Sequence, residues 1–370
     1  MKILHILPSL NKSSGVANAA MNLYRNIDRE RFSFDFLCFW DAPENYNEEV
    51  KACGGQAFLF TKPSLRHYSQ SKRELNRFFH EHSGEYDIIH CHEILLARII
   101  FPIARENGVK VCISHAHSTK FADKFLNAIR NRLLCRGLKN ISDYCLACSC
   151  VAGVKIFGKN MLVSGKFEVL HNGIEIKKHL FDLDGRKTFR KEFGIQKQTF
   201  LIAHAGRFTK SKNHKFLIKV FRIYHKKNIN AKLILAGNGL LQKKIKKNVQ
   251  KKKLTENVIF AGVIKDIPSL LAAADCFIFP SKFEGLGIAV VEAQASGLKC
   301  LASDKVPHEA GVTNLIDFLP LKSVNNWAQA IKANDIDTRV CYNKILENNN
   351  YDAVRTAARL EEIYIREANK

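Results

Sequence analysis

The chain has 370 residues, of which 46% are apolar, and carries a formal net charge of +23 with a pI near 9.6. This length and apolar content suit a soluble globular protein of two domains and exclude a disordered or fibrous one. Eleven cysteines without a regular framework fit a reducing compartment better than a disulfide scaffold, so we expect a cytoplasmic protein.

The first half of the chain alternates between apolar runs typical of buried strands and segments with helical periodicity. The first run ends at Pro8 and is too short for a signal peptide, and no later run approaches the ~20 residues of a membrane span. The alternation predicts a parallel, doubly wound α/β sheet. The predicted strands are Ile3–Leu7, Phe34–Phe39, Ala57–Phe60, Tyr86–His90, Val109–Ser114 and Tyr144–Ala147.

A basic amphipathic helix is predicted over residues 120–136, and Gly137 is expected to end it. Such a helix can lie in the interface of an anionic membrane. The alternative is an internal helix with a basic outer face, and the sequence leaves both open. The apolar side chains are Phe121, Phe125, Leu126, Ile129, Leu133 and Leu134, flanked by Lys120, Lys124, Arg130, Arg132 and Arg136, with Asp123 opposing them.

The spacing of Cys145, Cys148 and Cys150 could indicate a metal site. A closed zinc site needs four ligands, and no second cysteine or histidine pair follows at a suitable distance. We therefore interpret these cysteines as small apolar residues around the end of a buried strand, with Ser149 capping the next helix.

Residues 165–197 contain scattered charges and no sustained periodicity, so we place a linker between two domains there. A second series of apolar runs follows and predicts a second sheet of the same kind. The lysine-rich segment 243–253 is expected to form a solvated outer helix face. The predicted strands are Phe200–Ala205, Lys232–Ala236, Val258–Gly262, Cys276–Phe279 and Lys299–Ala302.

Two cations share the loop that follows the first strand of this second series. The loop reads GRFTKSKN from Gly206 to Asn213 and contains Arg207 and Lys212. In a parallel α/β sheet such a loop lies at the carboxyl end of the strands, where ligands bind. Two fixed cations there are suited to neutralising a diphosphate.

Two carboxylates lie eight positions apart around a predicted helix start, in the segment FPSKFEGLGIAVVEAQASG from Phe279 to Gly297. Gly285 and Gly287 leave backbone N–H groups uncovered where the helix begins, which favours an anion. At a rise of ~1.5 Å per residue, Glu284 and Glu292 lie at most about 12 Å apart. One could then reach a ribose and the other a sugar across a diphosphate, as in a nucleotide sugar.

These two motifs resemble those of retaining glycosyltransferases of family 4 (glycosyl transferases group 1), of the bacterial capsule and exopolysaccharide type. The resemblance spans nearly the whole chain and is most specific from Gly206 to Glu309. It implies the GT-B fold, two Rossmann-like doubly wound parallel-sheet domains that face each other across a cleft. The acceptor-binding domain would be residues 1–175, with a helix at about 353–370 packing back onto it, and the donor-binding domain residues 176–352.

The resemblance implies roles for residues of the donor-binding domain. Arg207 and Lys212 would hold the donor pyrophosphate, Glu284 the donor sugar and Glu292 the ribose hydroxyls. The remaining donor contacts would be Gly237, Asn238, Val263, Ile264, Gly285, Leu286, Gly287 and Ile288.

The resemblance also implies donor contacts from the first domain. Gly15 and Val16 match the family's Gly-Gly loop in position, although Ser14 stands where the first glycine is expected. His117, after the fifth strand, matches a histidine placed beside the donor sugar and is a catalytic candidate. His115 is the second choice there, and His90, at the end of the fourth strand, could contact the acceptor.

The implied reaction moves a sugar, with retention, from a nucleotide-diphosphate sugar to a saccharide or a polyprenyl-diphosphate-linked acceptor, UDP being the favoured nucleotide. It needs no cofactor and no metal, because loop cations and helix N–H groups would stabilise the departing diphosphate. Asp-x-Asp patterns at 182–184 and 335–337 follow no apolar strand and are interpreted as chance matches. The protein is expected in the cytoplasm, with a possible peripheral position at the membrane.

Two other functions stay open at this stage. A GT-B nucleotide-sugar 2-epimerase would need several acid and base groups in the first domain, for which His90, Glu93, His115 and His117 are candidates. A non-enzymatic nucleic-acid-binding protein would explain the charge but not two diphosphate loops at strand ends, so no nucleic acid partner is expected.

Overall fold

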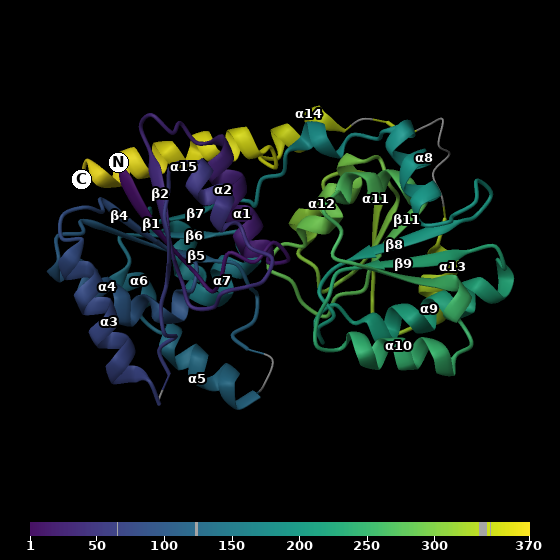
Figure 1. The fold of residues 1–370 in the computed structure, drawn as a ribbon, viewed down its shortest axis with the longest axis horizontal. Helices are drawn as coiled ribbons and strands as arrows, with labels where there is room; N and C mark the ends of the chain where they lie inside the picture. The colour runs from purple at the N-terminus through teal and green to yellow at the C-terminus, as the bar shows by residue number, and fades with distance from the viewer. Residues whose placement is uncertain (65, 123–124, 333–338, 341) are drawn as a thin grey trace. The chain divides into compact units, whose positions relative to one another are not determined.

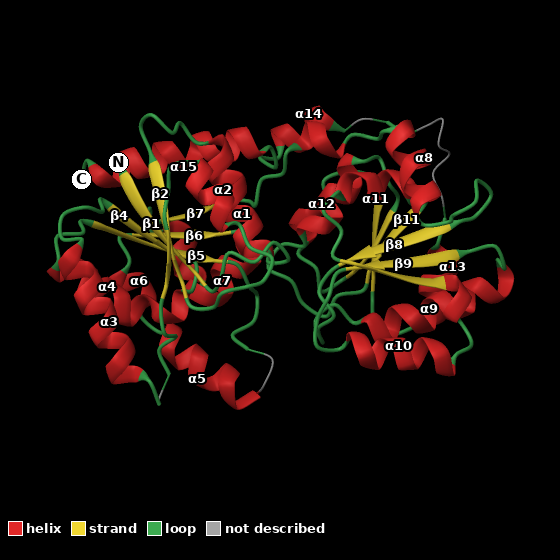
Figure 2. Ribbon diagram, viewed as in Figure 1, coloured by secondary structure: helices red, strands yellow, loops and turns green. Residues whose placement is uncertain are grey.

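The computed structural model describes residues 1–64, 66–122, 125–332, 339–340 and 342–370. These residues divide into two compact units. Unit 1 comprises Met1–Gly173 and Ala353–Lys370, and unit 2 comprises Ile174–Asp352. Each unit contains a parallel sheet with helices packed on both faces (Figure 2). The two doubly wound sheets predicted from the alternation of strands and helices are confirmed.

Within the described residues, unit 1 contains a seven-stranded sheet in the order β3-β2-β1-β4-β5-β6-β7. Every neighbouring pair is parallel, and the first six strands occur where the apolar runs predicted them, to within two residues at either end. The order places β1, β4 and β5 side by side. The strands are β1 Lys2–Leu7, β2 Ser33–Cys38, β3 Ala57–Leu59, β4 Ile88–Cys91, β5 Val111–Ala116, β6 Tyr144–Ala147 and β7 Phe167–Val169.

The C-terminal helix α15 (Ala353–Ala368) belongs to unit 1 and lies beside α1 on one face of its sheet (Figure 1). Leu360, Ile363 and Tyr364 of α15 are buried in the same hydrophobic core as Tyr24. The other helices of this unit are α1 Gly15–Asn26, α2 Asn47–Ala52, α3 Tyr68–Glu81, α4 Ala97–Glu106, α5 Phe125–Cys135, α6 Leu138–Ile141 and α7 Cys150–Phe157, with 3-10 turns η1 Ile94–Leu96 and η2 Lys159–Val163.

Unit 2 contains a six-stranded parallel sheet, counted over the described residues, in the order β10-β9-β8-β11-β12-β13. The strands are β8 Leu201–Ala205, β9 Lys232–Ala236, β10 Val258–Gly262, β11 Cys276–Phe279, β12 Cys300–Ser303 and β13 Ile316–Leu319. The helices are α8 Leu183–Glu192, α9 His214–Lys227, α10 Gln242–Lys251, α11 Ile267–Ala273, α12 Ile288–Ala295, α13 Val324–Ala330 and α14 Asn343–Asn348, with η3 Ile176–His179, η4 Thr255–Asn257 and η5 His308–Ala310.

The boundary between the two units, at Gly173 and Ile174, lies inside the segment 165–197 where the linker was predicted, but most of this segment is structured. It contains strand β7 and helix α8. Helix α8 lacks apolar periodicity because two of its buried side chains are arginines. Arg186 and Arg190 donate to the carboxylate of Asp275 at 2.7 and 2.8 Å, so the helix is held to the sheet by charge-assisted bonds.

The Asp182–Asp184 pattern has a structural role. The Asp182 side chain accepts from the Asp184 N–H at 3.0 Å and caps the start of α8. The second pattern, Asp335–Asp337, lies outside the described residues. In unit 1, Ser149 caps α7 by accepting from the Ala152 N–H at 3.1 Å, as predicted, and Cys145 and Cys148 are buried.

The basic segment around residue 130 forms a shorter helix than expected. Helix α5 runs from Phe125 to Cys135, and Gly137, with φ +76°, precedes the short helix α6. Asp123 and Lys124 lie outside the described residues. None of the helices in the described ranges combines the length and the apolar character that a membrane span requires.

Candidate functional site

The predicted donor residues of unit 2 gather at the carboxyl edge of its sheet. They follow β10, β9, β8 and β11, which are four consecutive strands of the sheet. Main-chain bonds tie the loops together: Phe208 N–H donates to Asn238 O at 2.7 Å, and Lys282 N–H donates to Ser211 O at 2.7 Å. The tertiary structure therefore brings loops that are far apart in sequence to one edge.

At this edge Lys212 and Glu284 form an ion pair. Lys212 Nζ lies 2.8 Å from Glu284 Oε1, with the two side chains 19% and 13% exposed. The same ammonium lies 4.4 Å from the centre of the Phe279 ring. The partial burial of this pair keeps it in a geometry that an exposed pair would not hold.

Glycines make the approach of these groups possible. A Cβ on Gly206 would lie 3.1 Å from Lys212 Cδ, so the absence of a side chain leaves room for the lysine stem. At Gly237, with φ +123°, a Cβ would lie 2.5 Å from the Gly206 carbonyl oxygen. Gly237 is therefore required by the close packing of the β8 and β9 loops, and Gly206 leaves room for the lysine stem within its own loop.

Helix α12 begins at the predicted place, directly after Gly287. Gly287 has φ +94°, and a Cβ there would meet Val306 Cγ1 at 2.9 Å. The first-turn N–H groups of a helix have no acceptor within the helix, and the helix dipole adds partial positive charge there. Gly285, Leu286, Gly287 and Ile288 thus lie at a helix terminus suited to an anion.

Glu292 lies on α12, one helical turn beyond its start, and faces a residue that we did not predict. His179 Nε2, from η3, lies 3.8 Å from Glu292 Oε1. His179 was missed because it falls in the segment interpreted as a linker.

The remaining donor candidates of unit 2 are more accessible. Arg207 is exposed, and within the described parts of the chain its side chain forms no hydrogen bond or ion pair. Asn238 is also exposed, whereas Val263 and Ile264, after β10, are half-buried.

In unit 1 the loop after β1 explains the serine that departs from the expected glycine pair. Ser14 caps α1 by accepting from the Ala17 N–H at 3.4 Å. The neighbouring Gly15 is exposed, and a Cβ there would meet nothing within 4 Å. Val16, the next residue, is half-buried.

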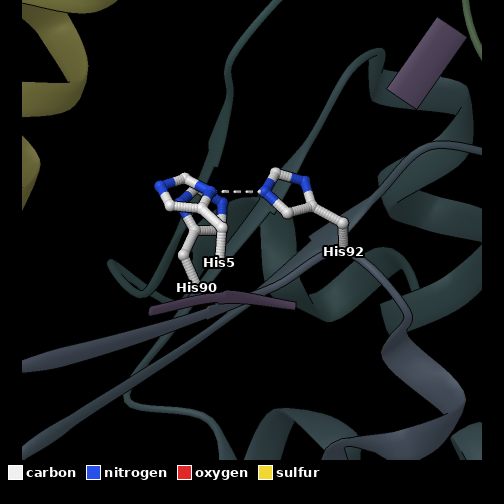
Figure 3. A group of neighbouring side chains, drawn as sticks. All are labelled: His5, His90 and His92. Atoms are coloured by element: carbon white, nitrogen blue, oxygen red, sulfur yellow. Dashed lines mark hydrogen bonds between the residues drawn. The ribbon is translucent and has the colours of Figure 1, made fainter. Parts of the chain in front are cut away.

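The three predicted histidines of unit 1 belong to a larger cluster that also contains His92 and His5, of which His5 was not predicted. His92 Nδ1 lies 2.8 Å from His117 Nε2, and His92 Nε2 lies 3.0 Å from His5 Nδ1 (Figure 3). The signal for this cluster is the two-residue spacing of His90 with His92 and of His115 with His117, which puts each pair on one face of its strand.

His90 and His115 lie inside the cluster. Their rings are 0% and 1% exposed, and His90 Nε2 lies 3.0 Å from His115 Nδ1. His90 Nδ1 lies 2.6 Å from the Tyr364 hydroxyl. Both ring nitrogens of His90 are therefore already hydrogen-bonded, and neither is available to the sugar acceptor in this conformation. His117 is half-buried at the carboxyl edge of the sheet.

Burial keeps these imidazoles neutral. It lowers the pKa of His5 to about 3 and the pKa of His117 to about 4, the latter partly offset by the Asn172 side chain. Burial, followed by the neighbouring rings, lowers the pKa values of His90, His92 and His115 well below 6.5. The cluster therefore offers lone pairs and N–H donors without net charge at neutral pH.

Known proteins resemble this chain over both of its units. The pattern described as Glycosyltransferase Family 4 matches residues 13–178, and that described as Glycosyl transferases group 1 matches residues 185–318. The chain is 31% identical to the putative glycosyltransferase EpsF of Bacillus subtilis (strain 168) over 98% of this chain and 96% of that protein. The chain belongs to glycosyltransferase family 4.

Two further proteins resemble this glycosyltransferase along its whole length. It is 25% identical to the UDP-Gal:alpha-D-GlcNAc-diphosphoundecaprenol alpha-1,3-galactosyltransferase of Escherichia coli, over 99% of this chain and 97% of that enzyme. The crystal structure of Anabaena Alr3699/HepE in complex with UDP and glucose matches with a TM-score of 0.76 at 17% identity, covering 98% of this chain and 99% of that one. The GT-B fold predicted from the sequence is confirmed.

Proposed function

We propose that this glycosyltransferase moves a sugar, with retention, from a UDP-sugar to a saccharide or polyprenyl-diphosphate-linked acceptor in bacterial surface polysaccharide synthesis. The observation that carries the proposal is the partly buried Lys212–Glu284 pair beside the start of α12. A cation, a carboxylate and a helix N-terminus at one sheet edge suit the diphosphate and the sugar of such a donor. The names of the Escherichia coli and Anabaena proteins support a uridine nucleotide.

In the proposed reaction the leaving group is the nucleoside diphosphate. Arg207, Lys212 and the first-turn N–H groups of α12 stabilise the negative charge that develops as the glycosidic bond breaks. Glu284 hydrogen-bonds the donor sugar, and Glu292 the ribose hydroxyls. From unit 1, the Gly15–Val16 loop and His117 contribute to the donor side.

We further propose that this stabilisation needs no divalent metal and no cofactor. The charge of the diphosphate is met by protein groups, since Arg207 is exposed and Lys212 is positioned at the edge. Arginine and lysine supply the compensation that a metal ion would otherwise give.

A contact with an anionic membrane surface is proposed for α5. Leu126 is 78% exposed and Leu133 is 56% exposed, and Ile129 lies between them on the same helix face. This exposure favours the interfacial helix over the internal one that the sequence left open. Arg130, Arg132 and Arg136 add positive charge next to the apolar face.

The test is a screen of nucleotide sugars for release of nucleoside diphosphate, with polyprenyl-diphosphate saccharides as acceptors. We expect release that depends on both the donor and the acceptor and that is lost in Arg207→Ala. An epimerase would instead convert the donor without any acceptor. Salt-sensitive RNA or DNA binding without turnover would point to the nucleic-acid alternative.

A further inference from the structure

The imidazole of His179 lies between two hydrogen-bond acceptors of unit 2. The residue belongs to η3, which packs against helix α12. Its Nε2 lies 3.8 Å from Glu292 Oε1, and the two side chains are 11% and 22% exposed. On the other side of the ring, Nδ1 lies 3.2 Å from the main-chain oxygen of Glu175. His179 therefore connects the carboxylate proposed for the ribose to the main chain of its own turn.

Neither neutral form of this imidazole suits both neighbours. A neutral imidazole has one N–H and one lone pair, whereas a carbonyl oxygen and an ionised carboxylate only accept. With the proton on Nδ1, the lone pair of Nε2 faces Glu292. With the proton on Nε2, the lone pair of Nδ1 faces the carbonyl of Glu175. Only the imidazolium, which has a proton on each nitrogen, presents an N–H to both.

The conflict would also disappear if the carboxyl group of Glu292 held the proton. An imidazole binds a proton more tightly than a carboxyl group, by about two units on the pH scale. A proton shared by these two side chains therefore resides on the imidazole. The contact is then a cation beside an anion, and it is lost when the imidazole gives up its proton at higher pH.

No other charged group around η3 replaces Glu292 as the partner. Besides α12, η3 packs against α11, which has no ionisable side chain, and against α14. The other charged side chains of η3 and of these helices are Lys177, Lys178, Lys344 and Glu347. Among the described residues none of these four forms an ion pair with His179, and Lys178 pairs instead with the Glu175 carboxylate at 2.6 Å.

A cation at this place can hold the carboxylate in one orientation without occupying it. At 3.8 Å, Nε2 is beyond hydrogen-bond distance, so both oxygens of Glu292 keep lone pairs for other donors. Partial burial limits the screening of the attraction between the two charges. A ribose then meets an acceptor that is already oriented, which lowers the cost of binding. A neutral His179 would instead set a lone pair against this carboxylate and favour its other rotamers.

We propose that His179 is a positioning residue whose imidazolium orients Glu292 for the ribose of the donor, an inference that rests on the proposed function of Glu292. Ribose binding is then tightest while His179 carries both ring protons. It weakens as the pH rises through the range of about pH 5 to 8 in which imidazoles lose their charge.

Two buried histidines beside the loop of Lys212 do not contribute to such a response. Burial lowers the pKa of His204 on β8 to about 4, and it lowers the pKa of His214 at the start of α9 to about 2. Both rings stay neutral above pH 5. A change in nucleoside affinity between pH 6 and 8 therefore does not arise from them.

The test uses uridine in place of UDP, because a terminal phosphate itself changes its charge near about pH 6. Calorimetric titrations of the full-length protein are compared between pH 6 and 8.5. In the wild type we expect the affinity for uridine to fall about two- to fivefold as the pH rises, the effect of a partly exposed ion pair. The ligand 2′,3′-dideoxyuridine lacks the hydroxyl groups that Glu292 would accept from and should show no such fall.

Two substitutions separate the charge of His179 from its shape. His179→Phe keeps a ring but removes the charge, so uridine should bind at pH 6 as weakly as it binds the wild type at pH 8. His179→Lys retains a cation throughout this range and should keep the higher affinity at both pH values. A pH response of uridine that persists in His179→Phe would overturn the proposal, as would an equal response of dideoxyuridine in the wild type.

His225→Phe is the matched control in the same unit. His225 is half-buried, packs against Phe221 and forms no ion pair within the described ranges. Helix α9 follows β8 and returns to the start of the parallel strand β9, so His225, in its last turn, lies at the edge of the sheet opposite to the site. This variant should retain the pH response of the wild type.

The pairing itself is read without ligand. In ¹H–¹⁵N correlation spectra of protein labelled at histidine, the doubly protonated ring of His179 should persist to a higher pH in the wild type than in Glu292→Gln. Identical titration of His179 in both proteins would overturn the proposal. If the two titrations differ but the wild type binds no uridine at any pH, the pairing stands and the result counts against the proposed function.

Discussion

The Lys212 ammonium lies 2.8 Å from the Glu284 carboxylate, on loops that are 72 residues apart in sequence. In the structure without ligand, the cation proposed for the diphosphate is therefore already paired with the carboxylate proposed for the sugar. A bound diphosphate must share that cation with Glu284. The diphosphate and the Glu284 carboxylate therefore compete for the Lys212 ammonium.

This competition predicts opposite effects of Glu284→Gln on binding and on transfer. We expect UDP to bind severalfold more tightly, because a competing anion is removed from Lys212, while transfer falls at least tenfold since the sugar loses its contact. Calorimetric titration with UDP and turnover of the intact donor measure the two effects. Glu292→Ala is the comparison variant and should weaken UDP itself. Equal losses of UDP affinity in both variants would mean that the two roles are divided wrongly.

The cations of the β8 loop should discriminate between a nucleotide and a nucleoside. We expect Arg207→Ala and Lys212→Ala each to weaken UDP far more than uridine, by about 1.5–3 kcal/mol, as is typical of a charged hydrogen bond. Lys210→Ala, an exposed lysine of the same loop, serves as the control with little effect. If uridine and UDP lost affinity equally, the variants would be misfolded and the assignment unsupported.

Transfer should survive chelation of divalent metals. If Arg207, Lys212 and the start of α12 carry the charge of the leaving diphosphate, EDTA should leave the initial rate within twofold of the untreated enzyme. The rate is measured as nucleoside diphosphate release before and after exhaustive dialysis against EDTA. Loss of turnover that magnesium restores would contradict metal-independent transfer.

The histidine cluster should make stability depend steeply on pH. The folded pKa is about 3 for His5 and about 4 for His117, whereas both would be near 6.5 in the unfolded chain. Unfolding therefore takes up protons between about pH 4 and 6.5, and stability is complete above pH 6.5 and is lost as the pH falls through that window.

The slope of this loss should reach about 1.4 kcal/mol per pH unit for each such histidine. Urea unfolding followed by circular dichroism at several pH values between 4.5 and 7.5 measures it. His117→Gln, at the edge of the sheet, should reduce the uptake by about one proton. Stability that does not change with pH across this window would show that the rings are not held neutral.

Helix α5 should bind anionic vesicles through both charge and apolar contact. Reversal of charge at Arg130, Arg132 and Arg136 is expected to release the protein from vesicles that contain phosphatidylglycerol, as is Leu133→Asp alone. Reversal at Lys243, Lys244 and Lys247 of α10 changes the net charge equally and should have a smaller effect. Sedimentation that is unchanged by the α5 variants would indicate that the basic face of this helix is only a solvated outer face.

Much of the fold and part of the site followed from local patterns. Most strands of both sheets were predictable because a strand buried between helices is apolar along its length, as in Cys276–Phe279, whereas the edge strands β7 and β13 were missed. The start of α12 was predictable from Gly287, since a glycine at a helix start is a local signal. Helix α8 was missed because its buried face consists partly of arginines paired with Asp275, and paired charges do not register as apolar periodicity.

The sequence alone determined which residues end the strands, because periodicity reports how the chain is buried locally. Only the tertiary structure decided which of these ends meet. The order β1-β4-β5 brings His5 to His90 and His92, and α15 adds Tyr364 from 274 positions beyond His90. Such contacts depend on strand order and on the packing of the C-terminal helix against unit 1. The spacing of neighbouring residues determines neither of these. The pairing of Lys212 with Glu284 arises in the same way, since only the adjacency of β8 and β11 places their loops together.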